Sequence, residues 1–338
     1  MKNLLLALLV LPLVSFGQIV NIPDVNFKKY LVGNKAINTN GDREIQVSEA
    51  SAFTDTIDCI NWNISNLKGI EAFTALTSLN CWGNQLTSLD VSKNTALTYL
   101  MCDNNQLTSL DVSKNTSLSS LKCSSNQLTS LDVSLNTVLT YLGCYENQLT
   151  SLDVSKNTAL TYLNCGYNQL TSLDVSKNIT LTKLYCFGNN LDSMDVSLNT
   201  ALTVLSCSGN QLTSLDVSKN TALTYLDCSE NQLTSLDVSK NTDLTFLKCG
   251  YNILTSLDVS LNTPLDYLDC SKNQLTSLDV SLNKALTYLD CSENQLTSLG
   301  LSKKTALTDL YCDGNKFDCA VLIGKYGIKN LGYSYCPN

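Results

Sequence analysis

The amino-acid sequence predicts a β-rich solenoid with short parallel strands on two faces, a small helical N-terminal cap and a short C-terminal cap. Cysteine recurs every 21 residues from Cys81 to Cys312, and asparagine follows each of these cysteines by three positions. A fixed period near 20 residues is typical of repeats that stack only on their neighbours. We therefore expect a signal peptide at 1–17, an N-terminal cap at 18–75, a solenoid at 76–315 and a C-terminal cap at 316–338.

The first residues, MKNLLLALLVLPLVSFGQ, place Lys2 before an apolar run at 4–14 and a small residue at Gly17. This pattern indicates a secretory signal peptide that is cut after Gly17. The apolar run is shorter than the roughly 20 residues that a transmembrane helix needs, and no cysteine stands at the cleavage point for lipid attachment. We expect an exported protein without a transmembrane segment, located outside the cell, at the cell surface or in the periplasm.

Composition excludes several classes of function. The formal net charge is −8 and the chain contains no histidine. An acidic chain does not suit nucleic acid, whose phosphates require clustered Lys and Arg. Without histidine, Ser-His and Cys-His catalysis and histidine-ligated metals are excluded. No nucleophile–base pair is evident either, so we expect a protein that is not an enzyme.

The N-terminal cap is predicted to hold two short helices, at 23–32 and 48–53, because Pro23 and Asp24 open the first amphipathic run. The linker at 38–49 matches several positions of a calcium loop of the EF-hand kind. Its candidate ligands are Asn38, Asn40, Asp42, the backbone carbonyl of Glu44, and Glu49. Arg43 stands where such loops need glycine. The alternative is a polar turn between helices, and no other cofactor is expected.

Each coil contains two similar half-turns, LTYLDCSENQ and LTSLDVSKNTD in the copy at 223–243. Alternation along a strand points the leucines, the cysteine and the valine inward. Buried cysteine behaves as a small hydrophobe, so we expect free thiols in the ladder. Outside it, Cys319 and Cys336 are candidates for a disulfide. The last coil departs from the pattern at Gly300, Lys303 and Lys304.

These repeats resemble the leucine-rich repeat family in its bacterial 21-residue variety, over about 240 of the 338 residues. The cap, with IPDVNF at 22–27 and LKGIEAFTALTSLNCWGNQLTSL at 67–89, is similar to that of internalin-type surface proteins. The resemblance implies a curved, right-handed solenoid that binds other macromolecules. The chain departs from internalins in the cysteines of its ladder, and no cell-wall sorting signal follows the repeats.

Two polar columns accompany the repeats. The asparagines from Asn84 to Asn315 should bond backbone groups of their own and the adjacent coil, because an unpaired buried amide costs about 1–3 kcal/mol. The aspartates from Asp90 to Asp279 should repel one another at a coil spacing of about 4.8 Å. Hydrogen bonds to Ser and Thr, nearby lysines, or a ladder of calcium ions are the alternatives that would compensate this repulsion.

The candidate binding face lies on the first half-turn, where the outward positions vary from coil to coil while LTSLDVS in the second half-turn is nearly constant. Aromatic side chains dominate interface energetics, so an outward aromatic stripe indicates a binding face. The alternative is that the rings only stack along the ladder. The predicted binding residues are Trp82, Tyr99, Met101, Tyr141, Tyr145, Tyr162, Tyr185, Phe187, Tyr225, Phe246, Tyr267 and Tyr288.

The sequence thus predicts an exported recognition or adhesion module that binds a protein partner through this face. A carbohydrate-binding surface is the alternative from another class, because tyrosine and tryptophan beside Asp and Asn also suit sugar rings. A purely structural surface protein is a third hypothesis.

Overall fold

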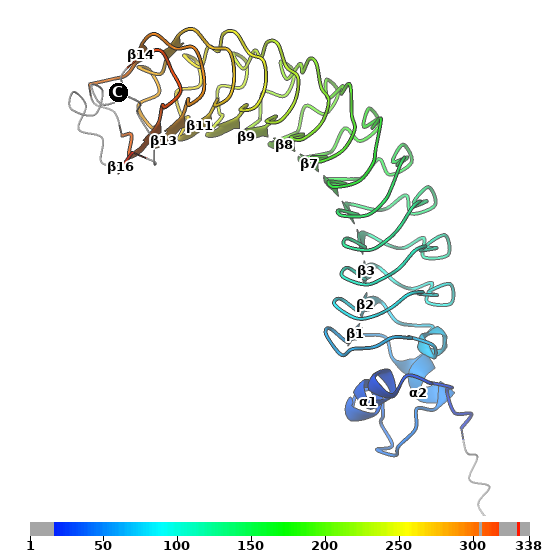
Figure 1. Cartoon of the computed structure of the whole chain (residues 1–338). Helices are drawn as coiled ribbons and strands as arrows, with labels where there is room; N and C mark the ends of the chain where they lie inside the picture. The colour runs from blue at the N-terminus through cyan, green and yellow to red at the C-terminus, as the bar shows by residue number, and fades with distance from the viewer. Residues whose placement is uncertain (1–16, 304–305, 318–329, 332–338) are drawn as a thin grey trace, which may run out of the picture.

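The computed structural model describes residues 17–303, 306–317 and 330–331 of the chain. These residues form a curved solenoid that begins with two short helices and continues as stacked coils along an arc (Figure 1). The expected solenoid and its parallel strands are confirmed. The helices are α1 (Val25–Gly33), α2 (Val47–Ala52) and the single 3₁₀ turn η1 (Ile70–Ala72).

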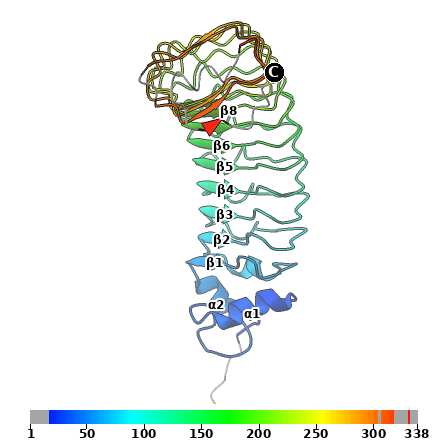
Figure 2. The same ribbon diagram turned by 60° about the vertical axis from the view of Figure 1, so that its left-hand side comes forward.

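One parallel sheet lines the concave side of the arc, with one short strand from each coil. In the turned view its strands β1 to β8 lie one above another (Figure 2). The described part of this sheet has 14 strands, which pair in chain order. They are β1 (Thr56–Asp58), β2 (Ser78–Asn80), β3 (Tyr99–Met101), β4 (Ser120–Lys122), β5 (Tyr141–Gly143), β6 (Tyr162–Asn164), β7 (Lys183–Tyr185), β8 (Val204–Ser206), β9 (Tyr225–Asp227), β10 (Phe246–Lys248), β11 (Tyr267–Asp269), β13 (Tyr288–Asp290), β15 (Asp309–Tyr311) and β16 (Asn330–Leu331).

The strands β1 to β15 of this sheet are three residues long because a turn follows each one. In β3 the central Leu100 is fully buried, while Tyr99 and Met101 point outward and are half-buried. Two residues beyond the inward Cys102, Asn104 adopts a left-handed φ of 53° that ends the extended segment. The equivalent position is left-handed in most coils, and it is occupied by glycine in four of them.

The second half-turn forms a ladder only near the end of the solenoid. There β12 (Leu278–Asp279) pairs with β14 (Leu299–Gly300). At the N-terminal end of the solenoid, one isolated bridge joins Asp90 to Asp111. Coils on the outer side of an arc are farther apart than those on the inner side, which disfavours a continuous backbone ladder there. Strands on two faces are thus present, but the second set is short.

Asparagine side chains connect the coils where that second ladder is missing. The amide of Asn115 donates to the carbonyls of Val91 and Asn94 in the preceding coil, at 3.0 and 2.9 Å. Asn94 to Asn283 repeat this arrangement in ten coils. An amide side chain reaches across the wider outer spacing, so it supplies inter-coil bonds that the backbone does not make.

The asparagine column that follows the cysteines, from Asn84 to Asn315, joins successive coils through both the nitrogen and the oxygen of each side-chain amide. Asn105 donates to the carbonyls of Cys81 and Cys102, at 3.0 and 3.1 Å, and its Oδ1 accepts from the Leu86 amide at 3.0 Å. The structural role expected for this column is confirmed. Each such residue satisfies three buried backbone groups at once, as buried polar groups require.

The N-terminal cap closes the first coil with apolar side chains from its two helices. Phe27 and Leu31 of α1 and Ala50 of α2 are fully buried. Asp24 is the N-cap of α1, where its Oδ1 accepts from the amides of Asn26 and Phe27 at 2.9 Å. Both predicted helices are present, and β1, which lies inside the segment assigned to the cap, already pairs with β2 of the solenoid.

Candidate binding face

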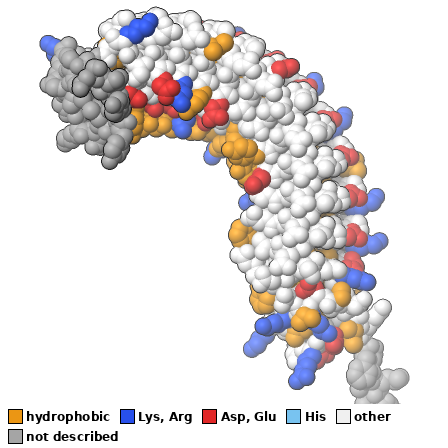
Figure 3. Space-filling view, viewed as in Figure 1, with side chains coloured by type: hydrophobic (Ala, Val, Ile, Leu, Met, Phe, Trp, Pro, Cys, Tyr) orange, Lys and Arg blue, Asp and Glu red, His pale blue; other side chains and the backbone are white. Residues whose placement is uncertain are grey.

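The outward positions of the concave sheet hold most of the predicted aromatic residues. Figure 3 shows hydrophobic side chains along the inner side of the arc and charged side chains along its outer edge. Each outward tyrosine is half-buried, because its ring lies on the sheet surface next to rings of adjacent coils. In-register pairing places equivalent positions side by side, which allows their rings to stack.

The C-terminal coils carry a continuous stack of four rings, which we call the C-terminal stack: Tyr225, Phe246, Tyr267 and Tyr288. Successive centroids lie 4.4, 4.4 and 4.2 Å apart, and neighbouring planes differ by 7°, 13° and 4°. Tyr311 extends it with a tilted ring 5.4 Å from Tyr288. The stacking alternative weighed from the sequence is therefore realised, and it covers the faces of the inner rings.

A second, shorter group lies in the N-terminal coils. The rings of Tyr141 and Tyr162 stack at 4.2 Å, and Tyr185 lies 5.5 Å from Tyr162 with a tilted ring. The Nζ of Lys122 lies 5.5 Å from the Tyr99 centroid and 5.0 Å from the Tyr141 centroid. Both are cation–π contacts, because each distance is within about 6 Å. The aromatic stripe predicted from the sequence is thus divided into two separate groups of rings.

Lys183 and Val204 separate the two groups, since they occupy the first positions of β7 and β8 where tyrosine stands in other coils. Tyr99 and Met101 share β3, where the tyrosine hydroxyl donates to the methionine sulfur at 3.3 Å. Trp82 is half-buried in the turn after β2, so it lies beside the sheet and not on it.

Tyr145 and Phe187 also lie in turns after their strands, and they form a separate cluster with Tyr167. The centroid distances are 5.5 Å for Tyr145–Tyr167, 5.8 Å for Tyr145–Phe187 and 5.2 Å for Tyr167–Phe187. We call these three residues the turn cluster. Tyr167 is not among the binding residues predicted from the sequence. It stands two residues after Cys165, at the position of each turn where the backbone is left-handed.

Two glycines make room for the turn cluster. A Cβ at Gly166 would lie 3.0 Å from the Phe187 ring, and a Cβ at Gly188 would lie 2.6 Å from the Tyr167 ring. Gly188 also has a left-handed φ of +64°. Tyr167 itself is left-handed, with φ 45°, which is uncommon for a bulky side chain. Its side chain is 55% exposed, so this turn presents an aromatic residue to solvent.

The stacked tyrosines remain protonated over the physiological range. Burial raises the pKa of Tyr225 to about 12, and the charge of Asp227 adds to this shift. Burial raises the pKa of Tyr267, which also faces Asp269 and Asp290. The face therefore offers neutral phenol groups that can donate and accept hydrogen bonds.

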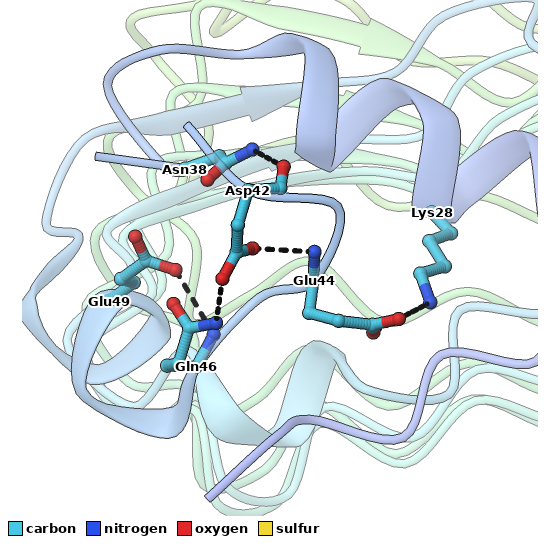
Figure 4. A network of polar contacts seen from close by, with 6 residues as sticks. All are labelled: Lys28, Asn38, Asp42, Glu44, Gln46 and Glu49. Atoms are coloured by element: carbon cyan, nitrogen blue, oxygen red, sulfur yellow. Dashed lines mark hydrogen bonds and ion pairs between the residues drawn. The ribbon is translucent and has the colours of Figure 1, made fainter. Parts of the chain in front are cut away.

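The calcium-loop candidates of the cap lie together, and their oxygens are engaged by the chain itself (Figure 4). Asn38 is buried and donates to the carbonyls of Val32 and Asp42, at 3.1 and 2.7 Å. The side chain of Glu44 pairs with Lys28 at 2.6 Å. Asn40 donates to Asp42 Oδ2 at 3.0 Å.

Glu49 fixes the end of the same loop. Its Oε1 accepts from the amides of Thr39 and Asn40 at 2.8 and 3.1 Å, and its Oε2 accepts from the Gln46 amide at 3.1 Å. Across the described segments, no three Asp, Glu, His or Cys side chains gather as a metal site would require. The polar groups of the loop thus bond largely to the chain itself, and the calcium site stays a prediction.

The outer aspartates each bond to the serine two residues later. Asp111 Oδ1 accepts from the Ser113 amide at 2.8 Å, and the backbone and hydroxyl of this serine lower the aspartate pKa. The other members from Asp90 to Asp279 have the same bond. Local hydrogen bonds therefore stabilise this column, as one of the alternatives predicted.

The ladder cysteines from Cys81 to Cys291 are free and fully buried, as expected. Their thiols point to the next coil; Cys102 Sγ lies 3.5 Å from the Lys122 carbonyl oxygen. Cys312 is disulfide-bonded, so the expectation of a free thiol is wrong at this position. The disulfide predicted between Cys319 and Cys336 lies outside the described residues. The same holds for Lys304 and for the predicted signal peptide before Gly17.

The ladder thiols are held in an unreactive state by their burial. Burial raises the pKa of the ladder thiols, to about 12 for Cys165, which leaves them protonated and unreactive. Within the described ranges no helix is long and apolar enough to cross a bilayer. Fold and face together define a solenoid with an exposed aromatic sheet surface on its concave side.

Comparisons with known proteins place this solenoid among leucine-rich repeat proteins. No family model and no curated protein matches the sequence. The solved functional domain of InlJ from Listeria monocytogenes, which includes a cysteine ladder, is 41% identical with a TM-score of 0.80, over 88% of this chain and 71% of that one. The internalin InlF from Listeria monocytogenes is 22% identical with a TM-score of 0.81, over 96% of this chain and 99% of that one.

A third solved structure is the leucine-rich repeat ectodomain of a plant membrane receptor kinase from Arabidopsis thaliana, in complex with Casparian strip integrity factor 2. It is 25% identical with a TM-score of 0.62, over 76% of this chain and 37% of that one. The chain is thus a leucine-rich repeat protein. It belongs to the internalin-type leucine-rich repeat proteins, to which the InlJ domain is similar in both sequence and fold.

The InlJ comparison also corrects one expectation. The ladder cysteines do not set this chain apart from internalins, because the InlJ structure includes a cysteine ladder too.

Proposed function

We propose that the chain is an exported, non-enzymatic recognition or adhesion module that binds a protein partner through its concave sheet face. The observation that carries this proposal is the half-exposed aromatic surface that runs along consecutive strands of one rigid sheet. Aromatic side chains on a preorganised surface lose little conformational freedom on binding and bury much area.

The ring geometry favours a protein over a glycan. Sugar rings dock on open aromatic faces, whereas within the C-terminal stack Phe246 and Tyr267 have a ring on each side at 4.2–4.4 Å. What remains outward are edges and phenol hydroxyls. Such groups suit polypeptide backbone and side chains, which offer hydrogen-bond partners next to apolar surface.

The similar structures support a binding role. The InlJ domain is described as the functional domain of that protein, and the plant ectodomain was solved with a bound factor. By analogy, the concave face of this chain would contact its partner while the outer half-turns, with their repeated lysines and hydrogen-bonded aspartates, keep the solenoid soluble.

A binding comparison tests the face. The triple variant Tyr141→Ser, Tyr162→Ser, Tyr185→Ser removes all three rings of the shorter tyrosine group in the N-terminal coils. The matched control Lys114→Ser, Lys156→Ser, Lys177→Ser changes three exposed residues of the outer half-turn. Both variants and the wild-type chain are probed on an array of extracellular proteins and on a glycan array, after thermal melting has established that they are folded.

We expect protein binding to fall at least tenfold in the tyrosine variant and to change less than twofold in the control. If the wild type binds a glycan but no protein, and the tyrosine variant loses that glycan, the carbohydrate alternative replaces the proposal. Unchanged binding in the tyrosine variant would assign the rings to packing alone.

Export has its own test. Expression of the full sequence in a bacterial host, followed by cell fractionation and N-terminal sequencing, should yield an exported protein that begins at Gln18. An intact N-terminus in the cytoplasmic fraction would contradict export while leaving the binding face untouched.

A further inference from the structure

Charge is distributed unevenly along the concave face. The outward strand positions of β2 to β8 carry two lysines, Lys122 and Lys183, and no carboxylate. Those of β9, β10, β11, β13 and β15 carry four carboxylates and one lysine: Asp227, Asp269, Asp290, Asp309 and Lys248. The acidic half coincides with the C-terminal stack, and Figure 3 shows charged side chains among hydrophobic ones on this inner surface.

Lys248 shows how an ammonium group fits this half of the face. In the sheet register it lies between Asp227 on β9 and Asp269 on β11. Its Nζ lies 5.7 Å from the Phe246 centroid and 5.6 Å from the Tyr267 centroid. A cation therefore lies near two stacked rings, on a strand whose neighbours both carry a carboxylate at the paired position.

One coil further on, the same surroundings recur without a lysine from the chain. Asp269 and Asp290 are register partners on β11 and β13, and Tyr267 and Tyr288 stack beside them. In each aspartate Oδ1 accepts from the following serine, at 2.7 Å from Ser271 Oγ and 2.6 Å from Ser292 Oγ. No hydrogen bond or ion pair within the described residues engages their Oδ2 atoms, which leaves these free to accept from a ligand.

Asp269 lies close enough to Asp290 for its charge to disfavour ionisation of Asp290. Burial raises the pKa of Asp290, and the neighbouring charges of Asp269 and Asp313 raise it further. A bound cation would remove this repulsion, because opposite charge nearby favours the ionised form. On the opposite side of Asp269, Gly250 leaves space for its carboxylate, since a Cβ there would lie 2.8 Å from Oδ1.

We propose that this acidic part of the concave face binds a basic segment of the protein partner, with one lysine or arginine side chain seated against Asp269 and Asp290 beside the Tyr267–Tyr288 stack. The inference rests on the proposed protein-binding function and adds the chemistry of the partner. A side-chain cation fits better than a metal ion, because the described residues place no third carboxylate at this position and the chain's own Lys248 occupies the equivalent place one coil earlier.

The test uses a fluorescein-labelled hexalysine peptide, with hexaglutamate as the charge-reversed probe, and measures fluorescence anisotropy against the full chain at 0.15 M salt, roughly the physiological level. The key variant is Asp269→Asn, Asp290→Asn, in which Oδ1 still accepts from serine. The matched control is Asp153→Asn, Asp174→Asn, which removes the same charge from the outer aspartate column. A third variant, Lys248→Gln, removes the internal cation.

We expect hexalysine affinity to fall at least tenfold in the key variant and less than twofold in the control. Lys248→Gln should bind hexalysine at least twofold more tightly, because it exposes another pair of carboxylates; a misfolded protein would not produce such a gain. Equal weakening in both double variants would overturn the proposal, since general electrostatic attraction would then explain the binding.

Failure here is distinguishable from failure of the proposed function. If the key variant binds hexalysine like the wild type while the tyrosine triple variant still loses its protein partner, the basic-segment inference is wrong and the recognition role stands. If the key variant loses hexalysine and the tyrosine variant keeps every protein contact, the acidic site stands and the wider face assignment is wrong.

Discussion

The rings of Tyr267 and Tyr288 lie parallel, with centroids 4.2 Å apart and planes that differ by 4°. Their backbones are register partners in β11 and β13, so the ring spacing is close to the spacing between strands. The sheet that carries the candidate binding face therefore also sets its geometry. Stability and recognition depend on the same side chains, and the predictions below separate the two.

Position within the stack should determine how much each ring contributes to stability. Tyr267 has a stacked ring on both sides, whereas Tyr225 stacks only on Phe246. Tyr267→Ser should therefore destabilise the C-terminal coils more than Tyr225→Ser, by about 0.5–1.5 kcal/mol, the contribution of one aromatic pair. Urea unfolding followed by circular dichroism measures the difference. Equal losses would mean that the stacked geometry contributes nothing beyond burial.

The two asparagine columns should respond differently to truncation. Asn147 donates to the carbonyls of Cys123 and Cys144 and accepts from the Leu128 amide. Asn157 donates to two carbonyls, but its buried Oδ1 has no partner among the described protein groups. Asn147→Ala leaves one more buried group unpaired and should cost about 1–3 kcal/mol more than Asn157→Ala. Calorimetric melting of the two variants gives the comparison, and a larger loss in Asn157→Ala would contradict it.

The thiol ladder should make the fold sensitive to alkaline pH. Burial raises the pKa of Cys59 and of Cys165 from 9.0 to about 12. The folded state therefore holds protons that the unfolded state releases above pH 9, so stability is complete below pH 9 and falls as pH rises toward 12. At pH 10, each such thiol lowers the free energy of unfolding by about 1.4 kcal/mol.

Melting temperatures measured between pH 7 and pH 11 test this dependence. The control variant is Cys144→Val, Cys165→Val, Cys186→Val, because valine fills the equivalent inward position in the other half-turn, as at Val154. Its melting temperature should fall less steeply with pH. Parallel curves would show that the thiols do not carry the effect.

The same burial should protect the thiols from reagents. The cysteines from Cys59 to Cys291 are free and fully buried, so a colorimetric disulfide reagent at pH 8 should not modify them until denaturant is added. Mass spectrometry after brief labelling identifies any residue that reacts. Rapid labelling of Cys165 in the native protein would mean that the coils open locally.

The cap loop should be stable without a metal ion. Glu49 accepts from the amides of Thr39, Asn40 and Gln46, so Glu49→Ala should destabilise the cap by about 1–3 kcal/mol whether or not calcium is present. Titration of the wild-type protein with calcium should give no heat, and a chelator should not change the melting temperature. A rise in melting temperature with calcium would instead assign Asn38, Asn40 and Asp42 to a calcium site.

The sequence by itself determined the coil, because each coil repeats one local pattern and meets only copies of itself. The inward Leu, Cys and Val positions, the bonded asparagines such as Asn105, and the two cap helices all follow from alternation, burial and capping signals within a few residues. The location of the aromatic face follows for the same reason, since Tyr99 and its equivalents alternate with buried leucines.

Only the tertiary structure decided how neighbouring coils meet. Curvature limits the outer ladder to β12 and β14, and it leaves asparagine to connect the other coils. Lys183 and Val204 divide the stripe, and Tyr145, Tyr167 and Phe187 converge from three coils. These contacts join residues one or two coils apart, at distances set by the bend of the whole array, so no single repeat encodes them.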